Sequence, residues 1–249
     1  MNIRSAIHDY LNTLYKDVMD RVYQKAKALL LEEFTPDALY LDCGAGNGSQ
    51  YQRLASASSP PSPSNYFGIE WDFEGALKAK KRGLQLVRAD LNRPLPFEDE
   101  VFECVFGLSV LEHLVNGCQF MKEVYRVLKS GGRMVLITPN LSEWFNVLLL
   151  IFGNMPSSGP HPDSSALVRK NTAVRFRDTG ISHVEDAIPT DRHLVVFTYK
   201  ALRYYLHSLG FNRVTTYTYG LYPLPRPVQP FFERIDPWHC HQMLFDCKK

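Results

Sequence analysis

The most informative chemical pattern in this 249-residue sequence is a glycine-rich turn at residues 41–48. Its sequence, LDCGAGNG, places three glycines at alternate positions between an apolar run and the start of a helical pattern. Glycine lets the backbone approach a ligand closely, because no Cβ intervenes and positive φ angles are accessible. The pattern predicts either a ligand-binding turn or a turn that only connects a strand to a helix.

Three acidic residues, Asp42, Glu70 and Asp90, each end a predicted strand. Ligands of open α/β sheets bind at the carboxyl ends of the strands, so the three acids together indicate a nucleotide site. Glu70 stands where a carboxylate accepts both hydroxyls of a ribose, and Asp90 can accept a hydrogen bond from an adenine amine. Trp71 and Leu91 offer apolar surface to an adenine ring. For each residue alone, a solvated loop or an ordinary core contact is the alternative.

Two common phosphate-binding motifs do not fit this turn. A dinucleotide fingerprint requires a third glycine where Ser49 stands, which disfavours NAD as the ligand. A Walker loop requires Gly-Lys-Ser/Thr, and no such triplet follows the turn.

The elements that must position these residues alternate between strands and helices. Apolar spacing predicts an N-terminal amphipathic helix, five β/α repeats and two closing strands. This order defines an α/β, doubly wound sheet of about seven strands, mostly parallel with a closing antiparallel hairpin. The predicted strands are 38–42, 66–70, 84–89, 101–110, 133–138, 211–219 and 239–246. The predicted helices are 3–34, 50–55, 73–82, 118–128 (ended by Gly131 and Gly132), 143–152 and one capped by Thr198.

We expect a single domain over residues 1–249, with an N-terminal helical segment at 1–35 and an insertion after strand five at 139–197. The insertion leaves the sheet at its ligand-binding edge, so we expect it to form the acceptor pocket or its lid. It offers apolar and polar side chains there: Trp144, Phe145, Phe152, His161, His183, Arg192 and His193. The Ser/Pro-rich segment 56–65 is predicted to be an exposed connector.

Composition excludes several other classes of protein. A formal net charge of +2 gives no reason to expect binding to nucleic acid or to an anionic membrane. The five cysteines include no C-x-x-C pair, which disfavours a disulfide framework or a zinc site and favours a cytoplasmic location. The longest apolar run, 144–152, is far shorter than the roughly 20 residues that span a bilayer. We expect a protein without a membrane span.

Four motifs together resemble the class I S-adenosylmethionine-dependent methyltransferases, which have a Rossmann-like fold. They are LDCGAGNG (41–48), GIEWD (68–72), RADLNRPLPFEDEVFECVFGLSVLEHL (88–114) and LKSGGRMVLITPN (128–140). The resemblance is close over 40–140 and looser over 192–248. The segment SVLEHL (109–114) is most similar to the small-molecule branch typified by quinone-biosynthesis methyltransferases.

The resemblance implies a role for each matching residue. Gly44 and Gly46, with Asp42 and Ala45 in the same turn, would surround the methionine part of S-adenosyl-L-methionine. Glu70 would hold the ribose hydroxyls and Asp90 the adenine amine. The remaining cofactor contacts would come from Trp71 and Leu91 on either side of adenine, and from Leu108 and Ser109 beside the sulfonium.

His113 is the predicted catalytic residue, acting as a base on a hydroxyl acceptor, since imidazole takes up a proton near neutral pH. A purely structural role is the alternative, and Glu112 is a weaker choice of base. His239 and His241 alternate along a predicted strand, but no third ligand is evident, so we predict no metal site.

The sequence therefore predicts an S-adenosylmethionine-dependent methyltransferase that acts on a small-molecule, glycan or lipid-like acceptor by O-methylation, with S-adenosyl-L-homocysteine as the other product. A non-catalytic subunit that binds S-adenosylmethionine is the first alternative. An NAD-dependent oxidoreductase is a second, opposed by Ser49. No nucleic-acid partner is expected, because the residues after strand four, LSVL (108–111), do not form an amino-methylation motif.

Overall fold

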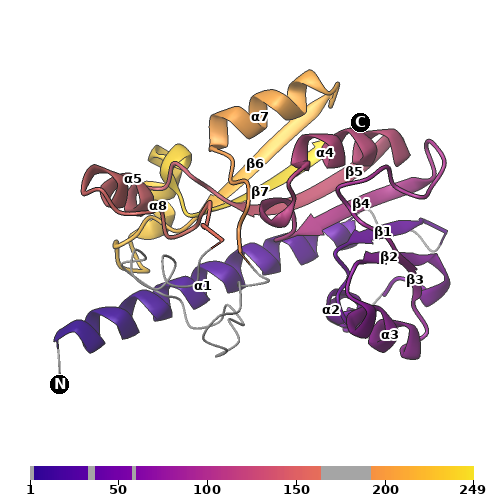
Figure 1. Ribbon diagram of the computed structural model, residues 1–249, viewed down its shortest axis with the longest axis horizontal. Coiled ribbons are helices and arrows are strands. Elements are labelled where there is room, and N and C mark those ends of the chain that lie inside the picture. Colours follow the sequence, from indigo (N-terminus) through magenta and orange to yellow (C-terminus); the bar gives the residue numbers. More distant parts are fainter. Residues whose placement is uncertain (1–2, 33–36, 58–59, 164–191) are drawn as a thin grey trace.

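The computed structural model describes residues 3–32, 37–57, 60–163 and 192–249. A seven-stranded sheet, in the order β3-β2-β1-β4-β5-β7-β6, runs through the molecule (Figure 1). Five strands are parallel, and β7 pairs antiparallel with both β5 and β6, which confirms the predicted sheet. The strands are β1 (Tyr40–Cys43), β2 (Tyr66–Glu70), β3 (Gln85–Arg88), β4 (Phe102–Leu108), β5 (Leu128–Pro139), β6 (Arg213–Tyr219) and β7 (Gln242–Lys248).

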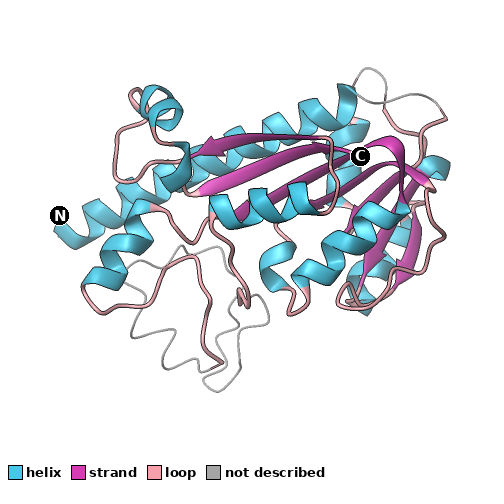
Figure 2. Ribbon diagram, turned by 90° about the horizontal axis from the view of Figure 1, so that it is seen from above, coloured by secondary structure: helices cyan, strands magenta, loops and turns pink. Residues whose placement is uncertain are grey.

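Helices cover both faces of the sheet (Figure 2). One face packs against α4 (Gly117–Val127) and α7 (Tyr199–Ser208), through side chains such as Phe120 and Leu202. The other face packs against three helices, α1 (Ile3–Glu32), α2 (Ser49–Ala55) and α3 (Phe73–Lys81). Burial of apolar side chains on both faces explains why the central strands are almost continuously apolar.

The winding of the chain reverses between β1 and β4. β1 pairs with β2 on one side and with β4 on the other, and the later repeats extend the sheet from β4. In such sheets the loops after these two strands diverge, which leaves a crevice at their carboxyl ends. The glycine turn that follows β1 opens onto this crevice.

The starts of two strands differ most from the expected ones. β5 begins at Leu128, so Gly131 and Gly132 lie within the strand and do not end the preceding helix. A Cβ on Gly132 would come within 2.8 Å of the Lys129 carbonyl oxygen, so close backbone packing explains this glycine. The last strand begins only at Gln242, after a short 3-10 helix, η3 (Pro237–His239).

Two connecting regions contain helical structure that was not predicted from the sequence. The segment 56–65 is not wholly exposed, because Pro61 is buried and its carbonyl accepts a hydrogen bond from the Tyr51 hydroxyl at 3.2 Å. It also contains a 3-10 helix, η1 (Pro63–Asn65). The helix α8 (Gln229–Ile235) was not predicted; it is short, and Pro230 lies in its first turn, where the missing N–H costs no hydrogen bond.

The helix predicted at 143–152 is observed as α5 (Trp144–Ile151). Its first residue, Trp144, donates a hydrogen bond from Nε1 to the carboxylate of Asp236, the residue after α8, at 2.7 Å. Thr198 caps α7 as predicted, since its side chain accepts a hydrogen bond from the Ala201 N–H. Among the described residues, no helix combines the length and the apolar character needed to cross a bilayer.

A buried arginine joins the long helix α1 to the sheet. The side chain of Arg133, on β5, is 4% exposed, and its Nη2 lies 3.3 Å from Oδ2 of Asp246 on β7. Its Nη1 donates a hydrogen bond to the Leu29 carbonyl at 2.6 Å. This carbonyl lies in the last turn of α1, where a cation is favoured by the helix dipole. This charged cluster thus adds to the apolar packing that holds α1 against the sheet.

We expect Asp246→Ala to lower the free energy of unfolding by roughly 3–5 kcal/mol, because it leaves the Arg133 guanidinium buried without its carboxylate. Glu32 is the matched control, since its 55% exposed carboxylate lies 3.4 Å from the same guanidinium. Glu32→Ala should cost less than about 1 kcal/mol. Urea denaturation measures both, and equal small losses would contradict this account.

Candidate active site

The glycine turn after β1 depends on left-handed backbone at three positions. Gly44, Gly46 and Gly48 have φ angles of +81°, +53° and +81°. A Cβ on Gly44 would come within 2.6 Å of a methyl group of Val110, so this position tolerates no side chain. The Gly44 and Ala45 N–H groups donate to the Ile69 carbonyl at 2.9 and 3.0 Å, which ties the turn to the end of β2.

The carboxylate of Glu70 is fixed beside this turn. Its Oε2 accepts a hydrogen bond from the Gly46 N–H at 2.7 Å, and its Oε1 accepts one from the Asp72 N–H at 2.8 Å. Each carboxylate oxygen has a second lone pair, so two further donors can bind the same group. Glu70 can thus accept hydrogen bonds from two neighbouring hydroxyls without reorienting.

A cavity of about 510 Å³ opens at the carboxyl ends of β1, β2 and β4. Its volume is that of a typical small-molecule site. Seven of the predicted site residues line it: Gly44, Glu70, Trp71, Asp90, Leu91, Ser109 and His113. The topology therefore brings together residues that are spread over 70 positions of the sequence, on turns that follow different strands.

The other predicted residues do not line this cavity. Asp42 is 1% exposed and accepts a hydrogen bond from the Tyr66 hydroxyl at 2.5 Å, so its carboxyl group lies in the core. Ala45 is buried in the same core cluster as Tyr66. Gly46 contributes its backbone N–H to Glu70, and Leu108 lines a second cavity of about 370 Å³ between α1 and α2.

The two residues expected around adenine have different environments. Trp71 is 64% exposed, so it is not an ordinary core residue, and the Arg88 guanidinium lies 5.7 Å from its ring centroid. Leu91 is 8% exposed and lines the cavity beside Asp90. Oδ1 of Asp90 accepts hydrogen bonds at 2.9 Å from the backbone and side-chain nitrogens of Asn92, which orients the carboxylate.

Ser109 adopts a positive φ angle of 59°, which is unusual for a residue other than glycine. Its N–H donates to the Ile137 carbonyl at 3.0 Å, and its hydroxyl lies 3.2 Å from the Tyr23 hydroxyl on α1. Ser109 lines the larger cavity and Tyr23 lines the smaller one. The sequence analysis did not single out Tyr23 as a neighbour of the site, because helical spacing predicts only which face of α1 is buried.

His113 lies in a short 3-10 helix, η2 (Leu111–His113), that follows β4. Its Nδ1 lies 3.2 Å from the Arg192 carbonyl oxygen, and its ring centroid lies 5.0 Å from that of His193. Burial lowers the pKa of His193 to about 4, despite a hydrogen bond to the Ser158 carbonyl that raises it. His193 is therefore a neutral imidazole at physiological pH.

Glu112 is buried next to these histidines. It is 2% exposed, and burial raises its pKa to about 7, although Oε2 accepts a hydrogen bond from the Thr138 hydroxyl at 3.1 Å. Among the residues that the structure describes, no lysine or arginine pairs with this carboxyl group. A carboxylate in this position costs free energy, and no local sequence pattern predicts its burial.

The insertion is described at 139–163 and 192–197, and His183 lies outside the described residues. Trp144 and Ile151 are 43% and 70% exposed, so α5 presents apolar surface to solvent, and Phe152, directly after the helix, is 77% exposed. The alternating arrangement expected for His239 and His241 is wrong, because His239 lies in η3, before the strand. Each histidine instead contacts a carboxylate. His239 Nδ1 lies 2.7 Å from the Asp236 carboxylate, and His241 Nδ1 lies 2.6 Å from the Glu143 carboxylate.

Residues 41–136 match the family described as "Methyltransferase domain". A ubiquinone/menaquinone biosynthesis C-methyltransferase of Geotalea daltonii is 29% identical over 141 residues, which cover 52% of this chain and 57% of that protein. A phthiotriol/phenolphthiotriol dimycocerosates methyltransferase of Mycobacterium tuberculosis is 34% identical over 98 residues, which cover 38% of this chain and 34% of that protein.

Among solved structures, a SAM-dependent methyltransferase from Archaeoglobus fulgidus superposes with a TM-score of 0.55 at 16% identity, over 91% of this chain and 94% of that one. Residues 41–136 are therefore similar to the methyltransferase-domain family, and the fold is similar to that of a solved S-adenosylmethionine-dependent methyltransferase. This confirms the resemblance predicted from the sequence. The aligned part spans only 41% to 57% of the first three curated relatives.

The buried carboxyl group of Asp42 predicts a pH-dependent stability. Burial raises its pKa from 3.8 to about 7, so the folded protein keeps a proton there that the unfolded chain releases near pH 4. The stability from this group is complete below about pH 4 and is lost as the pH rises to about 7.

We therefore expect Asp42→Asn to gain stability relative to the wild type between pH 4 and about pH 7, by at most about 4 kcal/mol. The asparagine side-chain oxygen can still accept a hydrogen bond from the Tyr66 hydroxyl. Urea denaturation at a series of pH values measures the difference, with exposed Asp37→Asn as the control. A difference that does not change with pH would show that Asp42 is ionised normally in the folded protein.

Proposed function

We propose that this protein transfers a methyl group from S-adenosyl-L-methionine to an acceptor hydroxyl, and that the cofactor occupies the cavity of about 510 Å³. The observation that carries the proposal is the convergence of Glu70, Asp90 and Gly44 on this one cavity. The solved structure with a TM-score of 0.55 and the family match at 41–136 support the choice of cofactor.

The residues in the cavity fit the parts of this cofactor. The Glu70 carboxylate, held by the Gly46 and Asp72 N–H groups, has lone pairs left for two ribose hydroxyls. Asp90 would accept a hydrogen bond from the adenine amine, with Leu91 and Trp71 against the ring. Gly44 and Gly46 leave room for the methionine part, which lies closest to the turn.

S-adenosylmethionine supplies a methyl group on a positively charged sulfur, and the thioether leaves without needing a proton. The chain must then align an acceptor with this methyl group and keep water out. Ser109, whose backbone is fixed by Ile137, lies between the cofactor cavity and Tyr23. His113, which lines the same cavity, would activate the acceptor hydroxyl.

The acceptor class is inferred from the apolar surface of α5. The exposed apolar residues of α5, such as Ile151, would suit a lipid-like or hydrophobic acceptor. The two curated relatives described above carry names of quinone and lipid methyltransferases, which supports the same class. A glycan or another small molecule remains an alternative acceptor, and the net charge of +2 gives no support for a nucleic acid.

The free cysteines fit a cytoplasmic enzyme.

Two other functions make different predictions. A non-catalytic subunit would bind S-adenosylmethionine without turnover, and the placement of His113 on the cavity wall favours an enzyme instead. An NAD-dependent oxidoreductase would need a glycine where Ser49 begins α2.

We expect Glu70→Ala to weaken binding of S-adenosylhomocysteine by at least roughly tenfold, because the loss of even one hydrogen bond to a charged group costs about 1.5–3 kcal/mol. Isothermal titration calorimetry measures this change, and a thermal melt checks that the variant is folded. Glu74→Ala, on the exposed first turn of α3, is the matched control and should bind like the wild type. Equal affinity in all three proteins would remove Glu70 from the cofactor site.

Activity is tested with methyl-labelled S-adenosylmethionine and cell extract, followed by counting of label in organic-soluble, small aqueous, glycan, protein and nucleic-acid fractions. The proposal predicts label in the organic-soluble fraction and at least a hundredfold lower rate for His113→Ala. Label in no fraction, with S-adenosylhomocysteine still bound, would favour the non-catalytic subunit. Label in the nucleic-acid fraction would overturn the proposed acceptor class.

A further inference from the structure

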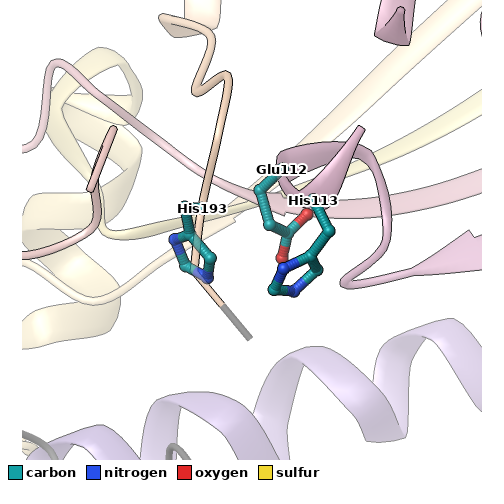
Figure 3. A group of neighbouring side chains, drawn as sticks. All are labelled: Glu112, His113 and His193. Atoms are coloured by element: carbon teal, nitrogen blue, oxygen red, sulfur yellow. The ribbon is translucent and has the colours of Figure 1, made fainter. Parts of the chain in front are cut away.

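Three side chains beside the cofactor cavity form a cluster that methyl transfer alone does not explain. Glu112 and His113 come from η2, and His193 comes from the chain that returns after the insertion (Figure 3). One donor atom from each residue lies within 4.8 Å of the other two. The three side chains converge on a common space, although His193 is 80 positions beyond His113 in the sequence.

Main-chain hydrogen bonds hold the two parts of the cluster together. The Glu112 carbonyl accepts the Leu194 N–H at 2.6 Å and the Val195 N–H at 3.3 Å. The residue before Leu194 is His193, so its position relative to Glu112 is set by the backbone. The cluster is therefore a feature of the fold and does not depend on the rotamers of long surface side chains.

The hydrogen bonds of both histidines fix the same tautomer. His113 Nδ1 lies 3.2 Å from the Arg192 carbonyl oxygen, and His193 Nδ1 lies 2.6 Å from the Ser158 carbonyl oxygen. A carbonyl only accepts hydrogen bonds, so both Nδ1 atoms carry the proton, and in a neutral ring Nε2 then carries the lone pair. Histidine ligands of metal ions are held in this way, with the distal N–H bonded to a carbonyl or carboxylate.

The carboxyl group of Glu112 completes the donor set. The Thr138 hydroxyl orients it at 3.1 Å, as outer-shell groups orient metal-binding carboxylates. Among the described residues, no lysine or arginine lies beside this carboxyl group to offset a negative charge on it. A divalent cation would supply the missing positive charge.

We propose that Glu112, His113 and His193 bind one Zn²⁺ ion, which takes the acceptor hydroxyl as its fourth ligand. Two histidines and one glutamate form a known donor set for catalytic zinc, in which three protein ligands leave one position open. The donors of a tetrahedral zinc site lie about 3.4 Å apart, so small side-chain rotations suffice to close the cluster. The sequence analysis predicts no metal site, and it could not find this one because His193 is far from Glu112 and His113 in the sequence.

This inference rests on the proposed function and changes the role of His113 from direct proton acceptor to metal ligand. Zinc lowers the pKa of an oxygen ligand, so the acceptor O–H bond breaks and its proton passes to water. An O–C bond then forms as the C–S bond of the sulfonium breaks, and the electron pair of that bond stays on sulfur. The substrate is thus an alcohol or phenol whose oxygen can reach both His113 and the methyl group.

The test measures metal content and activity separately. The purified protein is dialysed against Zn²⁺ and then against metal-free buffer, and bound zinc is measured by mass spectrometry. We expect about one ion per chain in the wild type, and at least hundredfold weaker binding in His193→Ala and in Glu112→Gln. The exposed His207→Ala, on α7, is the matched control and should keep its zinc.

Replacement by Co²⁺ gives a visible absorption band whose intensity reports four-coordinate nitrogen and oxygen ligands. The band should be present in the wild type and absent in Glu112→Gln, which keeps the size of the buried side chain. A wild type that binds no metal, or zinc that survives both substitutions, would overturn the inference.

Calorimetry with S-adenosylhomocysteine separates this result from the proposed function. Binding of S-adenosylhomocysteine and label transfer that withstand chelation would reject the zinc and leave the methyltransferase. Bound zinc without binding of S-adenosylhomocysteine would reject the methyltransferase and leave the zinc site.

Discussion

The hydrogen bonds between the turn after β1 and the end of β2 are the constraint on which the site depends. The Ile69 carbonyl accepts the Gly44 and Ala45 N–H groups, and the Gly46 N–H binds the Glu70 carboxylate. These bonds require left-handed backbone at Gly44 and Gly46, which glycine adopts without strain. They fix an acid and an open turn on the same rim of the cavity, before any ligand is bound. Preorganisation of this kind lowers the entropic cost of binding.

The opposite rim is built by a contact between distant parts of the chain. The residues that return from the insertion are hydrogen-bonded to the Glu112 carbonyl, and this brings His193 to His113. The site therefore has two halves with different origins. The β1–β2 half is made by local turns within the repeating β/α pattern, and it would hold the cofactor. The half around η2 is made by tertiary contacts, and it would hold the acceptor and the proposed metal ion.

This division explains what the sequence predicts and what it does not. Apolar spacing located all seven strands and the cofactor-side acids, because these signals are local and periodic. It placed the starts of β5 and β7 wrongly, since Gly132 serves close backbone packing and His239 belongs to a 3-10 helix. The burial of Glu112 and the contact between the Tyr23 and Ser109 hydroxyls depend on the tertiary fold, which no local pattern predicts. The metal cluster was missed for the same reason.

The central claim is that the cavity lined by Glu70 holds S-adenosylmethionine. A crystal structure of the protein grown with S-adenosylhomocysteine tests it most directly. The account predicts the ribose hydroxyls on the Glu70 carboxylate, the adenine amine on Asp90 and the sulfur beside Ser109. A ligand bound instead in the smaller cavity between α1 and α2, or none at saturating concentration, would contradict it.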